Sequence, residues 1–449
     1  MHSKKRRKKM KRNNTNRNLI IVMSCVCFLS IVSARVEAAS GDLDPFFGIG
    51  GKVTTTTGYS EKGNAMALQT DGKIVVAGVQ DVFLGRGLVV RYNADGSLDT
   101  TFGVGGFVYE SAHSSHETIF NAVAIQSDGK IVAAGYFVES GGCARDQSWV
   151  VRYNANGTRD TTFGGDGEVE YPYLYVNGCP VDSYHYGVAV LNNGKIVVAG
   201  ASKNASSNLD FAAARFNANG TLDTSFNLDG LATISIGTST DVANAVRIQP
   251  VTGKILLAGY SYNSATSNNF ALVKLDTNGL VDLSFGSAGK VTTDTGWDDR
   301  AYAVAFSGSK IVAAGKQSNA ATGADFSLAR YNSNGTLDIT FDGDGKLNTA
   351  FGAYYDFAFG IALQADGKVV AAGYGRSWSD TSDNFALSRY NTNGSLDTTF
   401  NIDGKQTTDF SGYADYGNAV AIQPDGKILV AGYTWNGNDY DVALARYLP

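Results

Sequence analysis

The sequence predicts an all-β protein, a seven-bladed β-propeller with four antiparallel strands in each blade. The segment Asp71–Gly78, DGKIVVAG, returns in seven related forms at intervals of 56 to 65 residues. Each copy holds short apolar segments separated by turns rich in Gly, Asn and Asp, and no long stretch follows the 3.6-residue period of a helix. Four-stranded units repeated at a fixed interval are typical of a propeller, in which each blade packs between two neighbours.

Two residues mark each copy. The first is the Lys of the DGK-type turn, found as Lys73, Lys130, Lys195, Lys254, Lys310, Lys368 and Lys427. The second is an Asp in a longer turn, found as Asp44, Asp99, Asp160, Asp223, Asp282, Asp338 and Asp397. The copies fill residues 41–449 as a single domain of repeats of about 58 residues each, which leaves no room for a second domain.

The seventh copy illustrates the four strands expected in every blade. They are Lys405–Asp409, Asn418–Gln423, Lys427–Tyr433 and Val442–Tyr447. The segment Ile428–Ala431 is apolar at every position, as in a strand that is covered on both faces. Antiparallel order places the Asn418–Gln423 strand innermost in the ring and the Lys405–Asp409 strand outermost.

The two ends of the array predict how the ring closes. The first strand, Gly51–Thr56, is of the outermost type, and the last, Val442–Tyr447, is of the third type. We therefore expect Gly51–Thr56 to complete the last blade, because this closure removes an exposed sheet edge. An open solenoid is the alternative, but it would need atypical polar repeats at its ends, and the first and last copies look like the others.

A basic residue ends the third strand of every copy. These residues are Arg91, Arg152, Arg215, Lys274, Arg330, Arg389 and Arg446. In the first six copies the turn Asp follows eight residues later, so a charge-assisted contact would hold the long turn against the strand. We expect a structural role, because seven identical catalytic sites are much less plausible.

Residues 1–38 have the pattern of a secretory signal peptide. Nine Lys or Arg and no acid lie within residues 1–34, and the apolar stretch Leu19–Val32 is shorter than the roughly 20 residues of a membrane span. Cleavage fits after Ala34 or Ala38, and export implies a secreted, periplasmic or cell-surface protein. The alternatives are a nuclear-localisation-like or nucleic-acid-binding basic tail, an uncleaved anchor and a lipidated N-terminus.

The rest of the chain is acidic, with 28 basic against 42 acidic residues. This balance argues against a nucleic-acid partner, and we expect no cofactor and no membrane span in the mature chain. Cys143 and Cys179 remain after cleavage, and in an exported chain they predict one disulfide. His113, His116 and His185 could offer zinc ligands, but ordinary loop histidines are the better interpretation, so no metal site is expected.

The connections of one face of the ring vary in length and content, whereas the other face repeats nearly identical turns. Binding is usually placed on variable loops of a rigid scaffold. An acid stands three residues before the expected innermost strand in five copies, and aromatic residues occupy the same loops. We expect ligand contacts from Trp297, Asp299, Tyr354, Asp356, Trp378, Tyr413, Asp415 and Trp435. Rings beside carboxylates suit a polyhydroxylated ligand, but acids that cap strand starts and rings that shield loop backbone are the more ordinary interpretation.

The motifs resemble a known family. The pattern DGKIVVAG, then FALARYN-like strand ends, then GSLDTTFG closely resembles the delta-60 repeat family of bacterial propeller-like repeats, over essentially the whole mature chain. The resemblance implies a bacterial exported or surface protein and carries over no catalytic residue. The second and third copies depart most, with longer loops and with Arg159 where the other copies have Leu or Val.

These observations favour an exported, non-enzymatic and monomeric binding module. Its variable face would bind a glycan, a peptide or a protein. The alternative is a carbohydrate-active or other hydrolytic propeller that uses Asp299, Asp356 or Asp415 as acid and base. Two acids that converge in a deep central pocket would favour the enzyme, and an even exposed ring of acids would favour binding.

Overall fold

The computed structural model describes residues 39–449 except 83–84, 112–116, 139–144, 172, 177–178, 320, 322, 353 and 378. The predicted signal peptide, Cys143, His113, His116 and Trp378 therefore lie outside the described residues. Within the described part of the chain, no helix has the length and hydropathy needed to cross a membrane.

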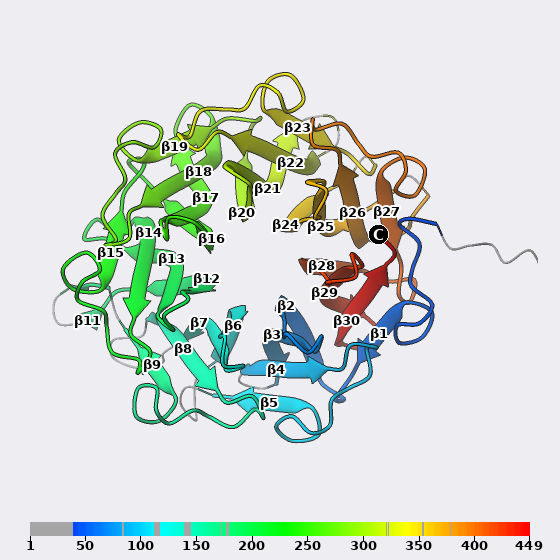
Figure 1. Ribbon diagram of the computed structural model, residues 1–449, viewed down its shortest axis with the longest axis horizontal. Helices are drawn as coiled ribbons and strands as arrows, with labels where there is room; N and C mark the ends of the chain where they lie inside the picture. The colour runs from blue at the N-terminus through cyan, green and yellow to red at the C-terminus, as the bar shows by residue number, and fades with distance from the viewer. Residues whose placement is uncertain are drawn as a thin grey trace, which may run out of the picture. The chain divides into compact units, whose positions relative to one another are not determined.

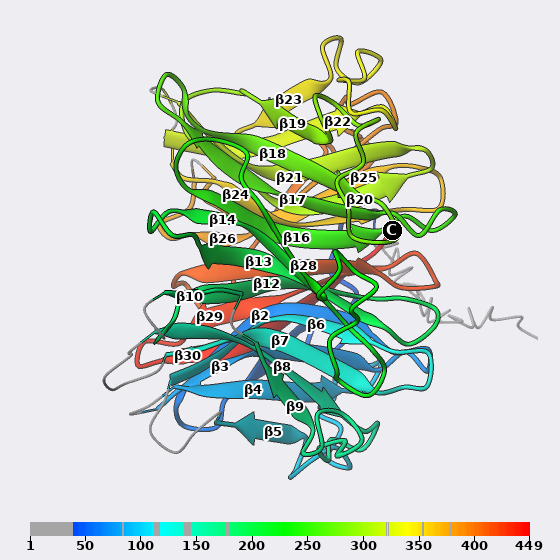
Figure 2. The same cartoon turned by 90° about the vertical axis from the view of Figure 1, so that its left-hand side faces the viewer.

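Seven four-stranded antiparallel sheets are arranged around a central axis, which confirms the predicted propeller (Figure 1). The strands run between the two faces of the ring, and the connections gather at those faces (Figure 2). The innermost strands are β2 (Ser60–Leu68), β6 (Glu117–Ile125), β12 (Ser183–Val190), β16 (Asp241–Ile248), β20 (Asp299–Ser307), β24 (Phe357–Leu363) and β28 (Asp415–Ile422). The second strands are β3 (Ile74–Asp81), β7 (Ile131–Val138), β13 (Ile196–Lys203), β17 (Ile255–Asn263), β21 (Lys310–Asn319), β25 (Val369–Gly375) and β29 (Ile428–Trp435).

The outer half of each blade is built from a long third strand and a short outermost strand. The third strands are β4 (Arg86–Tyr92), β8 (Asp146–Tyr153), β14 (Leu209–Phe216), β18 (Ser267–Leu275), β22 (Gly323–Tyr331), β26 (Asn384–Tyr390) and β30 (Tyr440–Tyr447). The outermost strands are β5 (Phe107–Glu110), β9 (Glu168–Glu170), β15 (Leu231–Ile234), β19 (Lys290–Thr293), β23 (Lys346–Thr349), β27 (Lys405–Thr408) and β1 (Lys52–Thr55). A further two-stranded hairpin joins β10 (Tyr175–Val176) to β11 (Cys179–Pro180).

The second and third strands are buried on both faces, as their continuous apolar sequences predict. Each hydrophobic cluster lies between two neighbouring blades rather than inside one. In the first such cluster, Val75 and Ala77 of β3 pack with Phe120 of β6 and Ile131 of β7. A blade alone would leave these faces exposed to water, so the packing of each blade depends on its neighbours.

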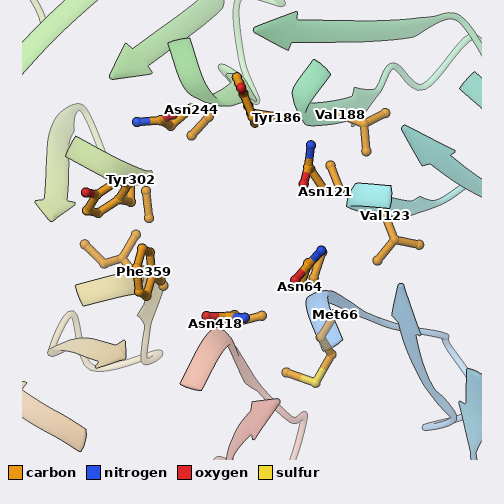
Figure 3. A pocket seen from close by; sticks show the side chains of 18 of the residues that line it. Asn64, Met66, Asn121, Val123, Tyr186, Val188, Asn244, Tyr302, Phe359 and Asn418 are labelled. Carbon is orange, nitrogen blue, oxygen red and sulfur yellow. The ribbon is translucent and has the colours of Figure 1, made fainter. Parts of the chain in front are cut away.

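The innermost strands begin about three residues earlier than the sequence predicts. In the seventh blade the strand starts at Asp415 and not at Asn418. A β-bulge explains the difference, because the register slips by one residue between Gly417 and Ala419 and leaves Asn418 unpaired. All seven innermost strands carry this bulge at the same place, and the bulged residues surround the central channel (Figure 3).

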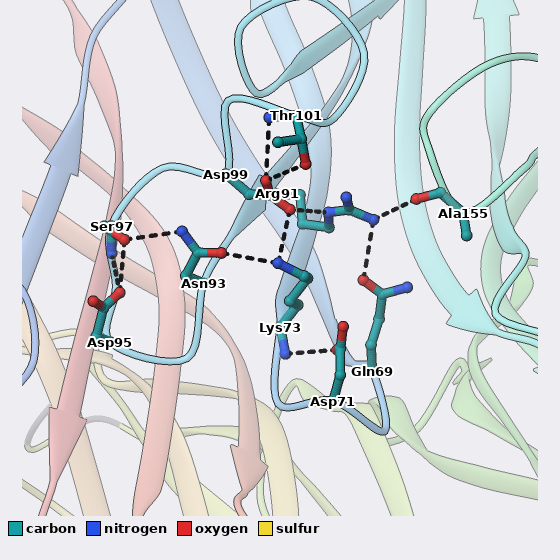
Figure 4. Close-up of polar contacts among 10 residues, drawn as sticks. All are labelled: Gln69, Asp71, Lys73, Arg91, Asn93, Asp95, Ser97, Asp99, Thr101 and Ala155. Atoms are coloured by element: carbon teal, nitrogen blue, oxygen red, sulfur yellow. Dashed lines mark hydrogen bonds and ion pairs between the residues drawn. The ribbon is translucent and has the colours of Figure 1, made fainter.

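The strand-end basic residues bind the turn Asp as the spacing predicts (Figure 4). In the first blade Arg91 Nε donates to Asp99 Oδ2 at 2.8 Å, and Lys73 Nζ lies 3.1 Å from the same oxygen. Arg91 and Asp99 are both buried, and the guanidinium also donates to the carbonyl of Ala155 in the next blade. We call this group of strand-end base, turn Lys and turn Asp the lock.

The lock recurs around the ring with little change. Its Arg Nε to Asp Oδ2 distance is 2.6–2.9 Å in the pairs Arg91–Asp99, Arg152–Asp160, Arg215–Asp223, Arg330–Asp338, Arg389–Asp397 and Arg446–Asp44. The fourth blade has Lys274 in place of Arg, and there Asp282 is bound by Lys254 at 2.6 Å.

The lock keeps its charges at neutral pH. Burial works to raise the pKa of Asp338, but hydrogen bonds from Thr340 and Lys310 and the charge of Arg330 outweigh it and lower the pKa to about 2. The ordinary pKa of an unfolded Asp lies near 4. The contribution of the lock to stability is therefore present above about pH 4 and is lost as the pH falls through about 2.

The seventh lock closes the ring between segments far apart in the sequence. Asp44 precedes β1, yet its Oδ2 accepts a bond from Arg446 Nε at 2.9 Å and lies 3.1 Å from Lys427 Nζ. The strand β1 pairs with β30 in the same blade. This pairing confirms that the first strand completes the last blade.

We predict that Arg446→Ala lowers the free energy of unfolding by about 3–5 kcal/mol, because it leaves Asp44 buried without its guanidinium partner. Chemical denaturation followed by tryptophan fluorescence measures the change. Arg300→Ala is the matched control, since Arg300 pairs with Asp298 at a partly exposed site and its loss should change the free energy by less than about 1 kcal/mol. Equal effects of the two substitutions would contradict a structural role for the lock.

Candidate functional site

The wall of the central channel is made by the bulged residues of the innermost strands. Four of them are Asn and three are aromatic, and all seven line a cavity of about 420 Å³ (Figure 3). They are Asn64, Asn121, Tyr186, Asn244, Tyr302, Phe359 and Asn418. The sequence placed Asn418 at a strand start and gave no sign of the channel ring, because Asn, Tyr and Phe all occupy the bulged position and no residue type marks it.

The asparagines of the ring join neighbouring blades. Asn64 Nδ2 donates to the carbonyl of Phe120 at 3.0 Å, and Asn418 Nδ2 donates to the carbonyl of Gly63 at 2.9 Å. Each bond reaches the innermost strand of the next blade just before its own bulge. Where the third, fifth and sixth blades carry an aromatic residue instead, a ring faces the channel (Figure 3).

The five acids of the loop pattern do not form an exposed ring. Glu61, Asp241, Asp299, Asp356 and Asp415 are all completely buried. Their carboxylates accept hydrogen bonds from the backbone of the preceding loop. This burial corrects the expectation that Asp299, Asp356 and Asp415 contact a ligand, because each acid stands at or just before the start of an innermost strand and binds backbone N–H groups of the loop before it.

Two of these buried acids illustrate the hydrogen bonds to the loop backbone. Asp415 accepts from the N–H of Phe410 at 2.9 Å. Asp356 accepts from the N–H of Phe351 at 2.8 Å and from that of Arg376 at 3.1 Å, so it ties the loop before β24 to the loop after β25. The carboxylates thus hold the variable loops in place from below.

Burial raises the pKa of both Asp356 and Asp415 to about 7. A carboxyl group with such a pKa is often a catalytic acid. Here neither group reaches the surface or the channel cavity, and each accepts at least one backbone N–H. The raised values therefore follow from structural burial.

Three of the predicted aromatic residues lie on exposed loops, whereas Trp435 is the half-buried last residue of β29. The exposed fractions are 66% for Trp297, 47% for Tyr354 and 49% for Tyr413. The structure brings Tyr413 and Trp435 together, in a hollow of about 440 Å³ between the sixth and seventh blades. Trp297 and Tyr354 line neither this hollow nor the channel.

The hollow contains residues that the sequence analysis missed. Tyr440, in β30, packs edge-on against Trp435 with ring centroids 4.9 Å apart. Thr381 and Ser382 add hydroxyl groups to the wall, and Gly412 and Ala414 complete it. Tyr440 begins β30, shortly after Trp435 ends β29. Its closeness in sequence to a predicted ligand-binding residue was the signal that could have identified it.

A chain of aromatic contacts connects the hollow to the channel. Consecutive ring centroids are 4.7–5.8 Å apart along the series Tyr440, Tyr433, Tyr416, Tyr374, Phe359 and Tyr302. The last two rings face the channel side by side (Figure 3). A continuous line of ring contacts thus runs from the hollow to the channel across the fifth, sixth and seventh blades.

His185 and Cys179 are structural within the described residues. His185 is buried in β12, with Nε2 at 3.0 Å from the hydroxyl of Tyr173, and burial lowers its pKa to about 3. It is therefore not a loop histidine as expected. Cys179 forms a disulfide, while the pairing with Cys143 stays a prediction because Cys143 lies outside the described residues.

Comparison with known families gives one match that spans the repeats. The family is described as "Domain of unknown function (DUF5122) beta-propeller", and it matches residues 69–102, 126–163, 191–226, 252–285, 309–341, 364–400 and 423–449, just over half of the chain.

The chain belongs to this family. Each of the first six matched segments of the DUF5122 propeller runs from the DGK-type turn to the Phe that follows the lock Asp by three residues. The seventh segment stops at the end of the chain, because its lock Asp is Asp44. The repeat unit of the family therefore contains the lock. The delta-60 name remains a resemblance.

No curated protein matches the DUF5122 propeller. Solved structures similar to it include YCF48 from Cyanidioschyzon merolae, with 12% identity, a TM-score of 0.44 and coverage of 89% of this chain and 99% of that one. A glucose dehydrogenase has 10% identity, a TM-score of 0.42 and coverage of 88% and 99%. The α-L-arabinofuranosidase Arb93A from Fusarium graminearum has 8% identity, a TM-score of 0.42 and coverage of 73% and 92%. At these values the similarities carry no functional argument.

We predict that the double variant Asp356→Asn/Asp415→Asn is more stable relative to wild type at pH 8 than at pH 5. The raised pKa values mean that the folded wild type keeps these groups protonated up to about pH 7, whereas the unfolded chain releases the protons near pH 4. The contribution of the two protonated carboxyl groups to the free energy of unfolding is fully present below about pH 4 and is lost as the pH rises through about 7. Asn does not titrate, so the double variant lacks this pH dependence.

Denaturation midpoints at pH 5 and pH 8 measure the difference. The control is Asp425→Asn, because Asp425 is exposed in the DGK-type turn and its loss should leave the pH dependence unchanged. An identical pH response of the double variant and wild type would show that Asp356 and Asp415 are charged in the folded protein.

Proposed function

We propose that this protein is an exported binding module that holds a glycan on its variable face, between the sixth and seventh blades. The observation that carries the proposal is the hollow lined by Tyr413, Trp435 and Tyr440. Its volume of about 440 Å³ falls within the range of ligand sites, from about 300 to 1,000 Å³. Two of its walls come from loops that differ between copies, which is where a repeat scaffold varies its ligand contacts.

The chemistry of the hollow favours a neutral sugar face over a charged peptide. Among the residues that line it in the described chain, none is charged. Aromatic rings cover the C–H faces of a sugar, and the hydroxyls of Thr381 and Ser382 can exchange hydrogen bonds with its hydroxyls.

The position of the carboxylates supports binding rather than hydrolysis. A glycosidase needs two acids on either side of the bond that breaks. Asp299, Asp356 and Asp415 are buried beneath the loops and hold backbone N–H groups. They therefore stabilise the loops that carry the aromatic residues.

The proposal includes export of the protein from the cytoplasm. It rests on the basic and apolar pattern of residues 1–38, with cleavage after Ala34 or Ala38. N-terminal sequencing of the protein recovered from outside the cytoplasm of the producing cells would identify the cleavage site.

We predict that a glycan array finds ligands for the wild-type protein, and that Trp435→Ala and Tyr413→Ala each weaken their binding at least tenfold. The physical reason is the loss of stacking area in a hollow with no charged group to compensate. Calorimetric titration with the best glycan of the array measures the loss.

Tyr262→Ala is the matched control for these variants. Tyr262 is an exposed tyrosine at the end of β17, in the fourth blade, and it lies outside the hollow. Its removal should leave the affinity within about twofold. The absence of any glycan ligand, or equal losses in all three variants, would overturn the proposed site.

A further inference from the structure

The central channel contains one side chain that breaks the repeat. Three residues after the bulge, six innermost strands carry Ala, at positions 67, 124, 189, 305, 362 and 421. The strand β16 has Arg247 at the equivalent position. Within the described part of the chain, Arg247 is the only charged residue among those that line the channel cavity. The exception therefore places one positive charge in an otherwise neutral channel.

The guanidinium of Arg247 has few partners in the protein. Its Nη1 donates to the carbonyl of Val246 at 2.9 Å. In the described chain no carboxylate lies within ion-pair distance of Arg247, whereas Arg446 of the closing lock is paired with Asp44. A guanidinium has five N–H donors in a planar fork that matches a carboxylate or phosphate group. Arg247 thus keeps most of its donors for a ligand.

The other wall residues suit a ligand with hydroxyl groups and one flat face. Asn244 uses its Nδ2 to bond the carbonyl of Ala301 at 2.7 Å, and the oxygen of the same amide can still accept a hydroxyl hydrogen. Tyr302 and Phe359, with ring centroids 4.7 Å apart, form an aromatic side of the channel (Figure 3). A volume of about 420 Å³ is enough for a sugar-sized molecule.

We propose that the channel is a second binding site, which takes a sugar-sized molecule bearing an oxyanion and binds that oxyanion at Arg247. Strands rise about 3.3 Å per residue, so the backbone of Arg247 lies about 10 Å along the strand from that of Asn244, towards the uniform face, and the long Arg side chain covers part of this distance. The carboxylate of a uronic acid and a phosphate group share the required chemistry. The hydroxyl groups of the ligand meet the asparagine amides of the ring.

This site is independent of the aromatic hollow. The two cavities share no lining residue, and the hollow contains no charged residue in the described chain. If no glycan binds in the hollow at Trp435, the channel proposal is unaffected. If no anion binds in the channel, the glycan proposal is likewise unaffected.

Calorimetric titration of the wild-type protein, Arg247→Ala and Arg247→Lys with glucuronate, glucose and inorganic phosphate tests the proposal. We expect at least one of the two anions to bind the wild type at least tenfold more tightly than glucose does. Arg247→Ala should weaken that binding at least tenfold. Arg247→Lys should lie between the two, because lysine keeps the charge and loses the planar fork.

The fold of Arg247→Ala is expected to persist, since Ala occupies this position in six blades, and its melting temperature verifies this. Arg300→Ala controls for loss of an Arg from an innermost strand, because Arg300 lies in β20, outside the channel cavity, and is paired with Asp298; it should bind within twofold of wild type. Binding of glucuronate alone identifies a carboxylate ligand, and binding of phosphate alone identifies a phosphate ligand. If neither anion binds the wild type, or if Arg247→Ala binds as tightly, the channel site is wrong.

Discussion

The buried pair between a strand-end Arg and a turn Asp is the interaction on which this ring depends. Each blade covers its apolar faces only by packing against two neighbours. The lock also connects neighbouring blades through hydrogen bonds, because Arg91 binds Asp99 of its own blade and donates to the carbonyl of Ala155 in the next one. In the seventh blade the same type of pair joins Arg446 to Asp44. The ring is therefore closed by the same Arg–Asp interaction that holds the turns of the other blades.

This constraint divides the molecule into two chemically different faces. The DGK-type turns and the lock turns share one face, where the Lys of one turn and the Asp of the other are bound to each other in every blade. The opposite loops are held from below by buried acids such as Asp356 and Asp415, which leaves their outer side chains free to vary. Tyr413, Trp435 and Tyr440 gather there, while the channel between the faces receives the bulged residues and Arg247.

The sequence was sufficient to predict whatever the repeat encodes directly. The seven copies, the four strands and the closing strand followed from periodicity, and the Arg91–Asp99 spacing of eight residues indicated the lock. The bulge could not be predicted, because Asn, Tyr and Phe all occupy the bulged position and no residue type marks it. The burial of Asp299, Asp356 and Asp415 was missed for a related reason, since the expected strands began after these acids and left them in the loops. Tyr440 and Arg247 were missed because their importance depends on which cavity they line.

Native-state hydrogen exchange of the Asp44→Ala variant most directly tests whether closure makes the ring a single cooperative unit. We expect the amides of β13 and β17, in the third and fourth blades, to lose protection together with those of β29 in the closing blade, because all blades then open in one transition. Loss of protection confined to β29 and β30, with β13 and β17 as protected as in the wild type, would contradict this. The blades would then be independent units held together only by neighbour packing.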